Sequence, residues 1–226
     1  MSRTKTDQAD AKLIARDALI LQPALWTPPP APIRELQALV RRVEPLLERI
    51  RMERNRQETA NAQVTDSIDT VLTTLDAELE ATRKAIHDHI DHPPDLKSRG
   101  DLLGTIPGIG EARIAHLLIA LSDHHGLSKA KQVVAFAGLA PAPRQSGQWS
   151  GNTHIAKNGD ALLRKALYMP ARCALRFNPL IRAFCQRLKA NGKNGKAVAC
   201  AAMRKLIHIA FGVLKSGNPF DPNDAT

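Results

Sequence analysis

The sequence predicts a mainly α-helical protein, with a helical hairpin or coiled coil followed by a second helical domain. Apolar residues recur at steps of three and four, and no stretch alternates convincingly between apolar and polar residues. All 13 glycines lie at or after Gly100, so the chain changes character there. Five prolines fall within residues 22–32, which predicts a stiff linker before the first long helix.

Three helical segments are expected before Gly100. Residues 1–21 are predicted to form a short helix, and residues 33–60 and 63–91 two long amphipathic helices with heptad-like spacing. The apolar positions of the long helices are Ile33, Leu36, Val40, Val43, Leu47, Ile50, Val64, Ile68, Val71, Leu75, Leu79, Ile86 and Ile90.

Neither long helix can bury its apolar stripe alone, which predicts a hairpin or coiled-coil domain over residues 33–95. The helices can pack against each other as an antiparallel hairpin or against a second subunit, and the sequence leaves both arrangements open. Pro45 is expected to kink the first helix, and Pro93-Pro94 to end the segment.

The second domain is expected over residues 99–218, with a tail at 219–226. Its helical patterns lie near residues 101–105, 111–121, 128–137, 159–175, 178–190 and 194–214.

Charge is unevenly distributed along the chain. Residues 1–123 carry 16 Lys/Arg and 19 Asp/Glu, whereas residues 124–226 carry 16 Lys/Arg and three Asp. The second half needs an anionic partner, and nucleic acid is the commonest one. Its basic residues accompany no long apolar face rich in aromatics, so a membrane surface fits less well. Because aromatics make up only 4% of residues, base stacking is not expected to be the main binding mode.

Compartment is predicted from the apolar runs and the cysteines. No apolar run approaches eighteen residues and no signal peptide is evident, which predicts an intracellular, cytoplasmic protein without membrane association. Cys173, Cys185 and Cys200 are an odd number without C-x-x-C spacing, which argues against a zinc site or a disulfide framework.

The most informative stretch runs from Phe136 to Lys165. It places Ser146 on a loop rich in Pro and Gly, preceded by Arg144 and followed by the cations Lys157, Arg164 and Lys165. Cations attract and orient phosphates, and a hydroxyl among them can attack a phosphodiester. The alternative is a basic surface loop whose serine caps a turn.

Three further patterns each have two interpretations. In Ile106-Pro-Gly-Ile-Gly110, Gly108 and Gly110 indicate either a helix-hairpin-helix turn that binds phosphate or an ordinary tight turn. Asp7 and Asp10 share a helix face and can help to hold a divalent cation, or can be solvated acids at a helix start. The histidines of 87–92 have metal-ligand types, but a solvated helix terminus explains them better.

In this order, the motifs resemble one family: transposases of the insertion-sequence 110/116/902 type, relatives of DNA invertases and described as bridge-RNA-guided serine recombinases. The resemblance covers nearly the whole chain. Its matching strings are Lys5-Thr-Asp-x-x-Asp10-Ala, Ile106-Pro-Gly-Ile-Gly110, Phe136-Ala-Gly-Leu-Ala-Pro141, Gln145-Ser-Gly147, Ile155-Ala-Lys-Asn-Gly159 and Leu162-Leu-Arg-Lys-Ala166.

The resemblance implies a DNA transposase or site-specific recombinase. Ser146 matches the family's nucleophile, and residues 99–218 its C-terminal transposase domain. Asp7 and Asp10 match the last two of four acids that bind Mg²⁺ in an RNase-H-like domain. The implied partners are DNA, a guide RNA and further copies of the chain, joined through the coiled coil at the bacterial nucleoid.

One departure from the family pattern bears on activity. The other two acids should lie on strands preceding Asp7, and the sequence has no such residues, so residues 1–21 resemble a C-terminal remnant of the RNase-H-like domain. We therefore expect an N-terminally truncated and impaired recombinase. The alternative function is a non-catalytic nucleic-acid-binding fragment.

Overall fold

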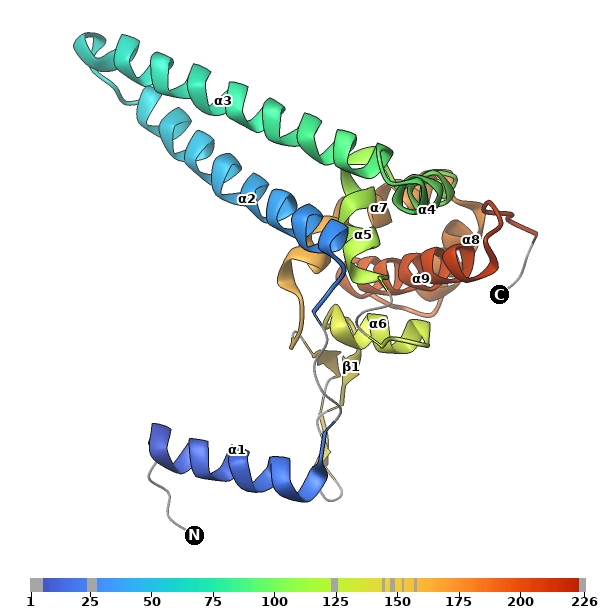
Figure 1. The fold of residues 1–226 in the computed structure, drawn as a ribbon. Helices are drawn as coiled ribbons and strands as arrows, with labels where there is room; N and C mark the ends of the chain where they lie inside the picture. Colours follow the sequence, from blue (N-terminus) through green and yellow to red (C-terminus); the bar gives the residue numbers. More distant parts are fainter. Residues whose placement is uncertain are drawn as a thin grey trace.

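The computed structural model describes residues 6–23, 28–122, 126–143, 145–146, 149–151, 153–156 and 158–223. Within these residues the protein is mainly α-helical, as predicted. Figure 1 shows a long helical hairpin projecting from a helical body, a thin β-ribbon leaving the body, and a separate N-terminal helix. The helices are α1 (Asp7–Leu21), α2 (Ala31–Gln57), α3 (Ala62–Asp91), α4 (Pro94–Gly104), α5 (Glu111–Ala120), α6 (Ala130–Phe136), α7 (Ala161–Phe177), α8 (Pro179–Ala190) and α9 (Gly195–Ser216).

Helix α1 has no buried residue. Thr6 caps its N-terminus by accepting a hydrogen bond from the Ala9 amide, at 3.3 Å. Its apolar side remains exposed, and Ile14 and Leu19 are 69% and 79% accessible. Packing therefore does not attach α1 to the body, from which it lies apart in Figure 1.

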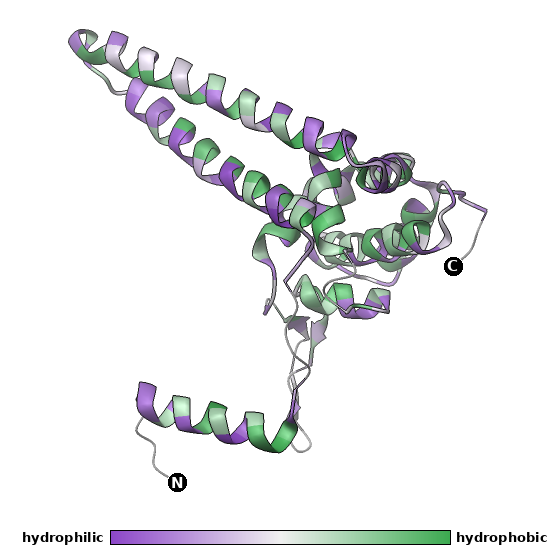
Figure 2. Ribbon diagram, in the orientation of Figure 1, coloured by the Kyte–Doolittle hydropathy of each residue, from purple (hydrophilic) through white to green (hydrophobic). Residues whose placement is uncertain are grey.

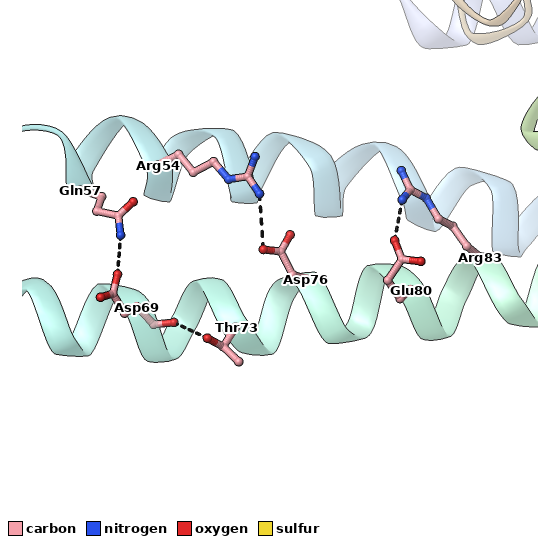
Figure 3. Close-up of polar contacts among 7 residues, drawn as sticks. All are labelled: Arg54, Gln57, Asp69, Thr73, Asp76, Glu80 and Arg83. Carbon is pink, nitrogen blue, oxygen red and sulfur yellow. Dashed lines mark hydrogen bonds and ion pairs between the residues drawn. The ribbon is translucent and has the colours of Figure 1, made fainter.

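Helices α2 and α3 form the antiparallel hairpin and pack against each other within one chain. Leu47, Val64 and Val71 of the predicted stripes are nevertheless exposed, and Leu46 is buried in the seam instead of Leu47. Helix α2 continues through Pro45 as one element. Away from the body the seam is narrow, and its buried residues are Leu46, Ile50, Leu72 and Leu79. Figure 3 shows polar contacts across the seam, where Arg54 pairs with Asp76 at 3.4 Å and Gln57 donates to Asp69.

The main core joins the base of the hairpin to the body. Leu36 and Val40 of α2 belong to the same buried cluster as residues of α4 to α9. The base of the hairpin therefore packs against the body, and one hydrophobic core includes residues from both predicted domains, 33–95 and 99–218. Leu206, Ile207 and Ala210 of α9 are fully buried. Figure 2 shows that α5 and much of α9 are hydrophobic.

Among the described residues, α9 alone is long and apolar enough by composition to cross a membrane. Half of its most apolar window is buried inside the protein. Packing in the core accounts for this composition, because the core helix of a folded domain has the same character.

Candidate active site

Between α6 and α7 the chain forms an antiparallel ribbon of four two-residue strands: β1 (Pro141–Ala142), β2 (Gln145–Ser146), β3 (Trp149–Ser150) and β4 (His154–Ile155). β1 pairs with β4 and β2 with β3. Ala142 pairs with His154, and Gln145 pairs with Ser150. Two residues therefore separate β1 from β2 in sequence, whereas three residues separate β3 from β4.

Ser146 lies at the far end of this ribbon. It is exposed, and its backbone pairs with Trp149 across a connection of only two residues. The strand pairing holds the Ser146 backbone, and the exposed position leaves its hydroxyl open to a large partner. Arg144 and Lys157, which were predicted to stabilise phosphates, lie outside the described residues.

The base of the ribbon is closed by backbone hydrogen bonds. The Ala156 amide donates to the Ala140 carbonyl at 2.8 Å, and the Asp160 amide to the Phe136 carbonyl at 2.9 Å. Gly159 has φ +148°, and a Cβ there would lie 2.2 Å from the Phe136 oxygen. Because no side chain fits this approach, the ribbon base requires glycine.

Asp160 and Arg164 fix the start of α7 against this base. The Asp160 carboxylate caps the helix by accepting from the Leu162 and Leu163 amides at 2.8 and 3.0 Å. The Arg164 guanidinium donates to the carbonyls of Ala137, at 3.0 Å, and Gly159, at 3.3 Å. Arg164 therefore links the segment that enters the ribbon, at Ala137, to the segment that leaves it, at Gly159.

Lys165 follows Arg164 but contacts another part of the fold. Its ammonium pairs with Glu44 of α2, although about two thirds of the lysine side chain is exposed. Predicted as nucleic-acid-binding residues, Arg164 and Lys165 thus have protein partners in this structure. Their contribution to nucleic-acid binding stays a prediction.

A small cavity of about 120 Å³ lies beside the ribbon base and is lined by His116, Asp160, and Gln37 and Arg41 of α2. Burial, and secondarily Arg113, lowers the pKa of His116 from 6.5 to about 4. The imidazole is therefore neutral at neutral pH. His116 could not be predicted as part of this site from the sequence. Its position beside Asp160 depends on the packing of α2, α5 and α7.

Acid should destabilise the fold through His116. Because its pKa is lower in the folded protein, the unfolded chain takes up a proton first as pH falls, and stability is lost between pH 6.5 and about 4. The expected loss at pH 5 is about 2 kcal/mol. Urea unfolding at pH 7 and pH 5 measures it, and His116→Gln should remove most of the difference. An unchanged pH dependence of stability in that variant would exclude His116 as the cause. The loss of stability would then be assigned to His208, whose pKa burial also lowers.

The glycine turn between α4 and α5 connects two helices, as predicted, but its glycines differ. Gly108 has φ +106°, and a Cβ there would lie 2.8 Å from the Ala174 Cβ, so α7 occupies that side of the turn. Gly110 precedes α5 in open surroundings, followed by the acidic Glu111. Helix packing accounts for Gly108, whereas phosphate binding by Gly110 stays a prediction.

Asp7 and Asp10 occupy the exposed first turn of α1. Within the described residues, no group of three or more His, Cys, Asp or Glu side chains could hold a metal ion. Asp7 and Asp10 are two of the four acids that the family resemblance implies, so Mg²⁺ binding at this position stays a prediction. Their favourable position at a helix N-terminus has its own explanation in the helix dipole.

The histidines near the end of α3 have separate partners. His87 contacts Glu111 at 2.9 Å, and His89 contacts the Pro32 carbonyl at 2.7 Å. His92 lies 2.5 Å from the Asp88 carbonyl. They do not converge on one point, which agrees with the interpretation of this string as a helix terminus.

Comparison with known proteins places this ribbon in a family context. Residues 100–186 match the model of the Transposase IS116/IS110/IS902 family. Over 222 residues, 97% of this chain and 69% of the relative, the sequence is 36% identical to the pilin gene-inverting protein of Moraxella bovis. The chain belongs to this transposase family. The pilin gene-inverting protein of Moraxella lacunata is 35% identical over the same shares, and an insertion element IS110 protein of Streptomyces coelicolor is 25% identical over 73% of this chain and 42% of its own length.

The match to the transposase family covers the ribbon and its supports. Residues 100–186 run from α4 through the glycine turn, α5, α6 and the ribbon into α8. Ser146, Gly159 and Arg164 all fall within this segment. The family's sequence pattern therefore coincides with the geometry that holds Ser146 at the end of the ribbon.

Proposed function

We propose that this chain acts in DNA transposition or site-specific DNA inversion as an impaired recombinase, and that the Ser146 hydroxyl attacks a DNA phosphodiester. The observation that carries the proposal is the exposed Ser146 at the end of a closed ribbon, inside the segment that matches a transposase family. The names of the Moraxella relatives describe gene inversion, which supports the same reaction class here.

The proposed step exchanges one phosphoester bond for another. The Ser146 oxygen forms a bond to phosphorus, the bond from phosphorus to one sugar oxygen breaks, and the serine proton leaves as the sugar oxygen gains one. Attack on this serine ester by a sugar hydroxyl of another DNA end would rejoin the strands and free the serine. No external energy source is needed, because each ester is exchanged for another.

Cations near the ribbon would stabilise the charge that develops on the phosphate. In sequence, Arg144 lies between β1 and β2 and Lys157 follows β4, and both are the proposed stabilisers. Arg164 is better assigned to holding the ribbon base, because its guanidinium already donates to two carbonyls. A guide RNA and Mg²⁺ belong to the proposal as partners that the family resemblance implies.

A covalent adduct tests the proposal. The chain is incubated with supercoiled plasmid carrying the DNA that flanks its gene, RNA transcribed from that DNA, and Mg²⁺. The reaction is stopped with detergent and digested with nuclease and protease. Mass spectrometry should find a nucleotide on the peptide that contains Ser146. A nucleotide on another peptide would contradict the assignment.

The alternative function is nucleic-acid binding without strand cleavage. It is favoured by residues 161–216, which contain 12 Lys/Arg and no Asp or Glu. Retained DNA binding without any adduct in the same experiment would support this alternative.

We also propose that the hairpin contacts a second copy of the chain. Leu47, Met52, Val64 and Val71 remain between 38% and 48% accessible on the hairpin, beyond what its internal seam buries. Light scattering at micromolar concentration should show a dimer, and Leu47→Glu with Val71→Glu should give a monomer. Leu19→Glu on the exposed α1 is the matched control. A monomeric unmodified chain would contradict the proposal.

A further inference from the structure

The loop between α8 and α9 contains the same tripeptide twice. Asn191-Gly192-Lys193 is followed directly by Asn194-Gly195-Lys196, and all of these residues are exposed. An asparagine followed by glycine can lose its side-chain amide without an enzyme, because the glycine nitrogen can attack the side-chain carbonyl carbon and close a succinimide ring. Glycine permits this approach because it has no side chain. The loop therefore holds two candidate modification sites whose local sequences match.

The two sites differ at the backbone nitrogen that would attack. The Gly192 amide donates a hydrogen bond to the Lys189 carbonyl at 2.9 Å, at the end of α8. Gly195 is the first residue of α9, and its amide has no acceptor in the part of the chain that the structure describes. The first amides of a helix have no partner within the helix. Of the two nitrogens, the one that follows Asn194 is therefore free to attack.

The carbonyl group of the Asn194 side chain is polarised for this attack. Its Oδ1 accepts a hydrogen bond from the Ala197 amide at 2.9 Å, which caps α9. Attack by nitrogen takes place at the carbon and moves negative charge onto Oδ1, where a hydrogen-bond donor stabilises it. The positive end of the helix dipole acts in the same direction. The capping bond therefore favours ring closure at Asn194.

We propose that Asn194 is a site of spontaneous deamidation and that the end of α8 protects Asn191. The Gly195 nitrogen forms a bond to the Asn194 side-chain carbon, the bond from that carbon to the amide nitrogen breaks, and ammonia leaves with the proton of the Gly195 amide. Water then opens the ring. Hydrolysis of the new bond gives aspartate, and hydrolysis of the original main-chain bond gives isoaspartate. The proposal does not depend on strand cleavage by Ser146.

The two products should affect the fold differently. Aspartate is a favourable residue before a helix and would keep the cap of α9. Isoaspartate adds a methylene group to the main chain at the start of α9, and Val198, one turn later, is only 1% exposed. Either product places a carboxylate within residues 161–216, which otherwise contain 12 Lys/Arg and no acidic residue. Deamidation would therefore lower the positive charge of α7 to α9 as the protein ages.

Mass spectrometry of the aged full chain tests the assignment. The chain is incubated at mildly alkaline pH, and the peptide that contains both Asn-Gly pairs is fragmented to locate the mass increase from amide to acid. Conversion should be about fivefold or more faster at Asn194 than at Asn191, because the hydrogen bond of the Gly192 amide must break before that nitrogen can attack. In urea, where the fold is lost, the two sites should convert at equal rates, since Gly-Lys follows both asparagines.

Two variants control for this result. Gly195→Ala should keep the fold, because no atom lies within 4 Å of the Cβ position, and should suppress conversion at Asn194 but not at Asn191. Asn194→Asp should keep the thermal midpoint of the fresh chain, whereas the aged chain, which contains isoaspartate, should have a lower one. Equal conversion of the two asparagines in the folded chain, or faster conversion at Asn191, would overturn the assignment. An Asn194 that converted in urea but not in the folded chain would do the same.

Discussion

Ser146→Ala is expected to abolish the covalent protein–DNA adduct and recombination while leaving nucleic-acid affinity unchanged. The substitution removes only the hydroxyl that forms the bond to phosphorus, and removal of a nucleophile costs on the order of 10³-fold or more in rate. The position is exposed at the ribbon end, so the free energy of unfolding should change by no more than about 0.5 kcal/mol. Gel analysis of detergent-resistant adducts measures the first effect and thermal unfolding the second.

Ser150→Ala is the matched control for this prediction. Ser150 lies on β3 of the same ribbon, where its backbone pairs with Gln145 beside Ser146. The control should form the adduct at the rate of the unmodified chain. If Ser146→Ala formed the adduct and Ser150→Ala did not, the nucleophile would be assigned to the wrong strand of the ribbon.

The long helices could be predicted from sequence because each repeats its signal many times. Along α2 and α3 the apolar residues recur over 27 and 30 residues, which specifies the element and most of its buried side, although Leu47, Val64 and Val71 are exposed. The strands of the ribbon could not be predicted. Each contains two residues, too few to show any alternation of apolar and polar side chains.

Proximity in sequence was a poor guide to the roles of the cations near Ser146. Arg164 and Lys165 are neighbours, but one clamps the ribbon base and the other pairs with Glu44, 121 positions away. Successive residues on a helix point in different directions, so their partners depend on which elements pack on each side. That packing is a tertiary property, and it also determines the surroundings of His116.

Composition was similarly limited as a guide to stacking. A low aromatic content indicates that aromatic platforms are few, but it does not indicate which rings are exposed. Tyr168 is accessible because the apolar side of α7 is supplied by Leu163, Leu167 and Ala171 instead, whereas Phe177 is the last residue of the helix. Only the helix orientation reveals that these rings lie among guanidiniums.

Gly159→Ala is expected to disrupt the ribbon base and with it all function of Ser146. Gly159 combines φ +148° with an approach that would place a Cβ 2.2 Å from the Phe136 oxygen and 2.8 Å from the Gly138 nitrogen. Both obstacles are backbone atoms, which cannot rotate away as a flexible side chain can. Relief requires breaking the hydrogen bond from the Asp160 amide to Phe136 and shifting the carbonyls that Arg164 holds.

The expected cost of Gly159→Ala is about 3 kcal/mol or more, which should lower the thermal midpoint by roughly 6–12 °C in a chain of this size. Gly192→Ala separates conformational strain from steric conflict, because Gly192 also has positive φ, at +73°, but no atom lies within 4 Å of its Cβ position. That control should cost about 1 kcal/mol and retain the adduct. Equal midpoints for the two variants would show that the close approach to Phe136 does not hold the ribbon. A stable Gly159→Ala chain that still formed the Ser146 adduct would show that the base of the ribbon does not position the serine.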